Sequence, residues 1–103
     1  MTIKDKMKAI DNILRNNIDG CTKITSREES NLLVFKVEFG TKATSIELNK
    51  EYVIKTELSA IESTFKQEHL YKLVTDINNP RITALGDNLN IMLNIGYSLG
   101  EWL

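Results

Sequence analysis

The segment from Asn88 to Tyr97 constrains the fold of this chain more than any other part of it. Large apolar side chains occupy every second position, and Asn90, Met92, Asn94 and Gly96 stand between them. The apolar series is Leu89, Ile91, Leu93, Ile95 and Tyr97. This period is typical of a β-strand with one buried face and one face toward solvent. The pattern therefore predicts a core built on a β-sheet.

Three earlier stretches have the features of strands. Leu32 to Phe39 is apolar on both faces, which predicts an interior strand. Cys21 to Arg27 alternates before it, and Ala43 to Leu48 alternates after it. Because the links between these stretches are short, we expect an antiparallel meander. Arg81 to Leu85 and the turn at Gly86 to Asn88 then predict a hairpin with the last strand.

Two helices are expected beside these strands. Thr2 and Asp5 form a capping box before apolar residues that recur at steps of three and four, and Gly20 supplies the stop. A second helix is predicted to end at Asn78 to Pro80. Its apolar residues are Leu70, Leu73, Val74 and Ile77.

The stretch from Glu51 to Thr64 fits either a strand or a helix. The residues from Tyr52 to Leu58 alternate as in a strand, whereas Ile54, Leu58, Ile61 and Phe65 follow the 3.6-residue repeat. We favour a short fourth strand at Glu51 to Glu57 followed by a helix from about Ser59, and the alternative stays open.

The order helix, meander, helix, hairpin predicts one α+β domain over residues 1–103. The antiparallel sheet would have five or six strands, and both helices would pack on one of its faces. The other face should be more polar, carrying Asn90 and Asn94 from the last strand. If that face is also apolar, the protein must dimerise or dock on a partner through it.

Charge and cysteine content limit the class of protein. Thirteen Lys plus Arg against fourteen Asp plus Glu give a formal net charge of −1, so no global field draws the chain to nucleic acid or to an anionic membrane. Cys21 is the only cysteine, which excludes an intramolecular disulfide and fits a reducing compartment. The charged segment Met1 to Lys8 does not resemble a signal peptide, and no apolar run is long enough to span a bilayer. We expect a cytoplasmic protein.

No group of residues has the spacing of a reactive site. His69 is the only imidazole and is expected on a helix surface, and Cys21 is expected to be inert. Gly96-Tyr97-Ser98-Leu99-Gly100 has the letters of a nucleophile elbow, but no acid and histidine follow at the required places. We therefore predict no catalytic residue, no metal site and no cofactor, and expect the protein not to be an enzyme.

A nucleic-acid-binding module is the alternative. Phe35 to Phe39 interleaves aromatic and charged side chains on a strand, and Lys4, Lys8 and Arg15 share roughly one helical face. Core packing explains the two phenylalanines, and Asp5 interrupts the basic face. An enzyme with a carboxylate site completed across a dimer is the third hypothesis.

The C-terminal residues carry the remaining hint of function. Trp102 either packs back onto the core, which we favour, or anchors another surface. In the second case Tyr97, Trp102 and Leu103 are the candidate partner-binding residues. By elimination we expect a non-enzymatic protein-binding domain that binds an unidentified protein or itself, such as a phage or mobile-element product that inhibits or adapts a larger host protein.

Overall fold

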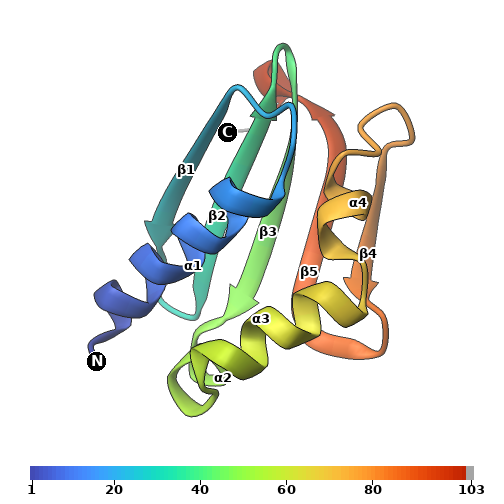
Figure 1. Ribbon diagram of the computed structural model, residues 1–103. Helices are drawn as coiled ribbons and strands as arrows, with labels where there is room; N and C mark the ends of the chain where they lie inside the picture. Colours follow the sequence, from blue (N-terminus) through green and yellow to red (C-terminus); the bar gives the residue numbers. More distant parts are fainter. Residues whose placement is uncertain (102–103) are drawn as a thin grey trace.

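The computed structural model describes residues 1–101 and forms two layers, an antiparallel sheet with helices in front of one of its faces (Figure 1). This confirms the predicted α+β class. In chain order the elements are α1 (Ile3–Asn17), β1 (Lys23–Glu28), β2 (Leu32–Phe39), β3 (Lys42–Asn49), α2 (Lys50–Lys55), α3 (Leu58–Gln67), α4 (Leu70–Val74), β4 (Arg81–Leu85), β5 (Asn88–Ser98) and the 3₁₀ turn η1 (Leu99–Glu101).

The sheet has the strand order β1-β2-β3-β5-β4. The meander β1-β2-β3 forms as predicted, and the chain then passes through the three shorter helices before it returns as β4. The hairpin folds back so that β5 pairs with β3 and leaves β4 outside. The two edges of the sheet are therefore β1 and β4.

The core lies between the helices and the inner face of the sheet. Cross-strand pairs place Phe35 opposite Ile46, and Ile46 opposite Leu93, all fully buried. The helices cover this face with Ile10, Leu14, Val53, Ile61, Phe65, Leu70 and Val74. Burial of these side chains is the main source of stability, since each contributes about 1.5–3 kcal/mol relative to exposure.

The start of α1 forms as the sequence predicts. The Thr2 hydroxyl accepts a hydrogen bond from the Asp5 amide at 3.2 Å, and the Asp5 carboxylate accepts one from the Thr2 amide at 3.1 Å. Hydrogen bonding of the carboxyl group to the backbone of Thr2, and then to its side chain, holds the pKa of Asp5 below its ordinary value. The helix ends at Asn17, and Gly20 adopts φ +80° in the link to β1.

The favoured strand at Glu51 to Glu57 is wrong, because this segment forms α2. Asn49 caps the start of the helix by accepting a hydrogen bond from the Tyr52 amide at 3.2 Å. At the other end, Nζ of Lys6 donates to the carbonyl oxygens of Val53, Ile54 and Thr56 at 2.8, 3.1 and 3.0 Å. A lysine from the distant α1 thus satisfies the terminal carbonyls of a helix too short to be stable alone.

The second predicted helix is also divided where the sequence predicts continuity. His69 adopts the left-handed conformation, with φ 58° and ψ 36°, and separates α3 from α4. The change of direction allows both Phe65 and Leu70 to be buried. The predicted end of this helix at Asn78 to Pro80 is wrong, because α4 already ends at Val74. The Val74 carbonyl accepts a hydrogen bond from the buried Thr44 hydroxyl at 2.9 Å.

Two residues of β5 depart from its alternation. The register shifts near Gly96, so that Tyr97 lies opposite Ala43 on the outer face of the sheet, not on the inner face with Ile95. Leu89 extends beyond the covered part of the strand and is 80% exposed. The position of Tyr97 follows from a local backbone irregularity, which a strict period of two does not contain.

Candidate interaction surface

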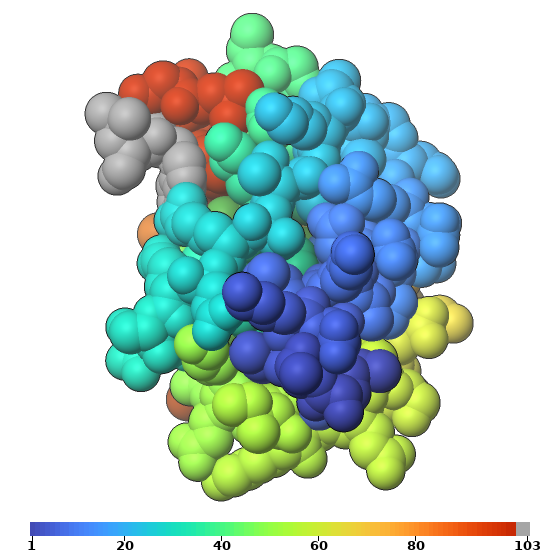
Figure 2. Space-filling model, turned by 90° about the vertical axis from the view of Figure 1, so that its left-hand side faces the viewer, coloured from blue at the N-terminus to red at the C-terminus, as the bar shows by residue number. Residues whose placement is uncertain are grey.

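The two edges of the sheet differ in how well they are protected. On β1, the side chains of Lys23, Arg27 and Glu28 are exposed, and charged side chains discourage edge-to-edge pairing. Arg15 of α1 also donates from Nη2 to the Ile24 carbonyl of this strand at 2.8 Å. Figure 2 views the molecule from this side, where the side chains of α1 lie against those of β1. The β1 edge is thus covered in part.

The β4 edge has none of these features. Arg81 is its only charged residue, and within residues 1–101 no strand pairs with its outer side. Ile82 lies on the outer face and is 71% exposed. Ala84 and Met92 lie opposite each other beside it and are half-buried. We call this surface, made of Arg81–Leu85 and Met92, the β4 border.

The outer face of the sheet is divided into a charged and a neutral half. Over β1, β2 and β3, cross-strand pairing gathers the charged side chains Lys23, Arg27, Lys36, Glu38 and Glu47 on this face. Over β5 and β4, the described residues on the same face carry no charge, and Asn94 lies opposite Ile82. The expected polar outer face is therefore correct for β5, but the face becomes neutral and partly apolar toward the β4 border.

A hollow of about 560 Å³ adjoins the start of β4. Its lining residues include Lys42, Arg81, Ile82 and Tyr97. The chain turns sharply here at Gly96, whose φ is +74°, and a Cβ at this position would lie 2.5 Å from the carbonyl oxygen of Ile77. Only glycine therefore permits this close approach.

The two ends of the β4 border carry opposite charge. At its start, Arg81 donates to Asp76 at 2.9 Å, and this bond lowers the pKa of the carboxyl group. Lys42 adds a cation that is in no ion pair with any residue of the described part. At the other end lie the turn residue Asp87 and the carboxylate of Glu68, which occupies the space beside Gly86.

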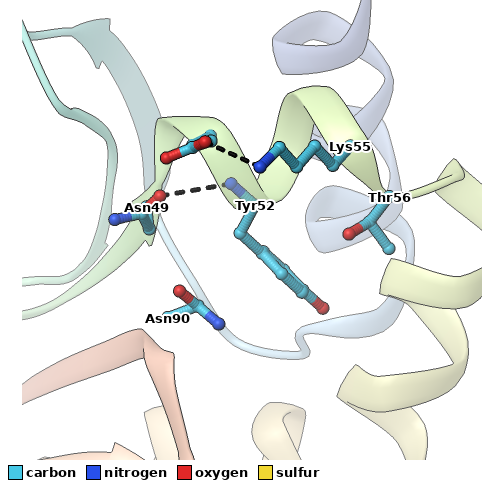
Figure 3. A pocket seen from close by; sticks show the side chains of 6 residues that line it. Asn49, Tyr52, Lys55, Thr56 and Asn90 are labelled. Carbon is cyan, nitrogen blue, oxygen red and sulfur yellow. Dashed lines mark hydrogen bonds and ion pairs between the residues drawn. The ribbon is translucent and has the colours of Figure 1, made fainter.

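A second hollow, of about 350 Å³, lies between α2 and β5 (Figure 3). Lys55 and Glu51 pair across one turn of the helix at 2.7 Å, and this bond holds the pKa of Glu51 below its ordinary value. Asn49 is occupied in capping α2, and Asn90 approaches from the strand opposite. These polar side chains either bond to one another or face solvent, as side chains on an ordinary helix surface do.

The residues singled out in the sequence are dispersed. Tyr97 is 8% exposed on the outer face, and burial raises the pKa of its hydroxyl to about 12. Trp102 and Leu103 lie outside the described residues. Cys21 is half-buried against the core, with Sγ 3.7 Å from the Ile18 carbonyl. His69 is exposed at the break between α3 and α4.

The basic residues of α1 are engaged or interrupted. Arg15 pairs with Asp11 at 2.6 Å, and Lys6 is bound to α2. Lys4 and Lys8 line a small surface hollow together with Asp5 and Asp11. In the part of the chain that the structure describes, no group of three or more His, Cys, Asp or Glu residues is arranged to hold a metal ion.

Comparison of the chain with protein-family models, with curated proteins and with solved structures found no match. Among residues 1–101, no helix is both long and apolar enough to cross a membrane. The β4 border is the surface that sequence reasoning missed. Its only signal in the sequence is the low charge of Arg81–Leu85, and that signal has meaning only once the strand order places β4 at an edge.

Proposed function

We propose that this chain is a non-enzymatic protein-binding domain that binds its partner through the β4 border. The observation that carries the proposal is an edge strand with one charge, no strand paired with its outer side among residues 1–101, and Ile82, which is 71% exposed. Natural sheets usually blunt such an edge, and an exposed edge is a template for strand addition.

The chemistry of the border defines the kind of partner segment that fits. Main-chain groups on the outer side of β4 would pair with an extended segment, which supplies affinity without regard to sequence. Five residues of strand correspond to a segment about 17 Å long. Ile82 and the neighbouring hollow would favour an apolar side chain on the outer face. Because the described residues on the outer face over β5 and β4 carry no charge, a partner that binds there does not have to desolvate a charged side chain.

We further propose that the domain acts in a reducing compartment such as the cytoplasm, as an adaptor or inhibitor of a larger protein. Support for the reducing compartment comes from the single, half-buried thiol of Cys21. Its many Ile, Lys and Asn residues are typical of proteins of low-GC bacteria and their phages, which supports an origin in a phage or mobile element.

A photo-crosslinking amino acid at position 82 tests the proposal. Expressed in a low-GC bacterial host, the protein with the crosslinker in place of Ile82 should form protein adducts on illumination. The matched control carries the crosslinker in place of Ile54, which is 57% exposed on α2, away from the border. The substitution Ile82→Lys, combined with a crosslinker at Met92, should abolish the adducts, because a charge on the edge opposes pairing.

Adducts at position 82 that are absent at position 54 support the border as the contact surface. Equal adducts at both positions, or none at position 82, overturn it. If the chain instead retards short oligonucleotides at low salt, with affinity that falls steeply as salt rises, the nucleic-acid alternative replaces the proposal.

A further inference from the structure

We infer that the β4 border binds a second copy of this chain, with the two β4 strands paired antiparallel about a two-fold axis at Thr83. The inference rests on the proposed function and names the partner. It joins the two five-stranded sheets into one continuous sheet with all helices on the same side.

The side chains of β4 are compatible with pairing to themselves. With Thr83 opposite its own copy, Ile82 of one chain lies opposite Ala84 of the other, twice by symmetry. A large and a small apolar side chain are thereby matched on the outer face, with Met92 beside them. The exposed Ile82 is covered without any charged residue being buried on that face.

Charge selects the antiparallel arrangement. The start of the border carries Arg81, which pairs with Asp76, and Lys42 lies two strands further in, across the hollow on β3; the end of the border carries Glu68 and Asp87. Antiparallel pairing brings the positive start of one copy beside the negative end of the other at both ends of the junction. Parallel pairing would place like charges together, which opposes association.

The other edge does not offer the same surface. Arg15 binds the Ile24 carbonyl of β1, so a second chain would first have to displace this hydrogen bond. Among the described residues, no side chain from another element binds the backbone of β4. The hydroxyl of Thr83 donates to the carbonyl of Ala84, the next residue in its own strand, at 3.1 Å. The free edge of the sheet is therefore β4.

The size of the junction predicts a weak dimer. Five paired residues with their neighbouring side chains form an interface at the small end of the range for specific complexes. We expect association in the micromolar range or weaker, on the order of 10⁻⁶ to 10⁻⁴ M. Because the end contacts are between charged groups, the dissociation constant should rise with salt.

Sedimentation equilibrium from about 1 µM to about 1 mM protein tests the inference. The chain should pass from monomer to dimer, and Ile82→Lys should raise the dissociation constant at least tenfold. The control Ile54→Lys makes the same chemical change at an exposed site on α2 and should leave dimerisation unchanged. Both variants change exposed side chains, so circular dichroism should show that both are folded.

A charge exchange identifies the arrangement. Arg81→Glu and Asp87→Lys should each weaken the dimer, and the two together in one chain should restore it, since antiparallel pairing sets Arg81 of one copy opposite Leu85 of the other, two residues before Asp87. A chain that stays monomeric throughout, a dimer insensitive to Ile82→Lys, or a double variant weaker than either single variant would each overturn the inference. If a monomeric chain still forms adducts with another protein at position 82, the proposed function survives.

Discussion

At the scale of single residues, Lys6 has a structural role that its position on a charged helix conceals. Its ammonium group donates to three main-chain carbonyls at the end of α2, and two of these bonds are partly buried. Lys4, two residues earlier in α1, is exposed and has no such partner among the described residues. The two lysines therefore form a natural comparison.

We predict that Lys6→Met lowers the free energy of unfolding by about 2 kcal/mol, because hydrogen bonds to a charged donor and the favourable cation at a helix C-terminus are both lost. Lys4→Met should change it by less than about 0.5 kcal/mol. Urea unfolding followed by circular dichroism measures both values. Equal effects for the two variants would show that Lys6 contributes only its charge.

Tyr71 has a buried hydroxyl that makes no hydrogen bond with the described residues. Its ring packs edge-on to Phe65 with centroids 6.3 Å apart. Burial raises the pKa of this hydroxyl to about 12, with the nearby Glu62 carboxylate acting in the same direction. The phenol is therefore kept neutral in the folded state.

An alkaline loss of stability follows from this pKa. The unfolded chain ionises near pH 10, whereas the folded chain holds the proton to about pH 12, so the free energy of unfolding should fall as pH rises through this interval. Tyr71→Phe should reduce the slope and leave stability near pH 7 within about 0.5 kcal/mol. Unfolding curves at pH 7, 10 and 11 measure this effect. A slope that is unchanged in Tyr71→Phe would contradict the prediction.

At the scale of elements, the sequence pattern predicted correctly those elements that interactions between neighbouring residues determine. The capping box at Thr2 was sufficient to predict the start of α1, and the residue patterns of β2 and β5 were sufficient to predict these two strands. The nature of α2 was not predictable, since the group that completes it, Lys6, lies 47 residues away from Val53. Alternation and helical repeat coexist in that segment, and a distant contact decides between them.

The break at His69 illustrates the same limit. The apolar repeat continues through it, yet burying both Phe65 and Leu70 requires a left-handed residue between two helices. Glycine marks this conformation most clearly in a sequence; histidine adopts it more often than most residues but is not specific to it. Packing of the two helices therefore imposes a strained backbone conformation that the sequence pattern does not reveal.

Replacing this histidine should stabilise the fold. His69→Gly removes the steric cost of φ 58°, and we expect the free energy of unfolding to rise by about 0.5–1 kcal/mol, since the greater freedom of glycine in the unfolded chain offsets part of the gain. Thermal unfolding followed by circular dichroism provides the measurement. His69→Ala, which has a Cβ and the same strain, should show no such gain. A destabilised glycine variant would indicate that the exposed imidazole makes a contact worth more than the strain.

At the scale of the whole molecule, strand order decides which surface is available. No property of Arg81–Leu85 in isolation marks it as an edge, and that position arises because β5 returns between β3 and β4. The candidate surface therefore could not be predicted from local sequence pattern, although the sequence does show that the hairpin carries few charged residues. The sequence-based hypothesis of Tyr97, Trp102 and Leu103 as partner-binding residues remains a prediction, with Tyr97 on the outer face beside the same hollow.

The arrangement also predicts where the backbone is protected. β3 is central in the sheet and is paired on both sides, whereas β4 is paired on one side only. Hydrogen exchange followed by mass spectrometry should therefore show the slowest amides in β3 and faster exchange at the outward amides of β4. Raising the protein concentration from about 1 µM to about 1 mM should slow exchange in β4 if a second copy pairs there, and should leave β1 unchanged. Slowing at β1 in place of β4 would instead assign the self-association to the opposite edge, where Arg15 would have to release the Ile24 carbonyl.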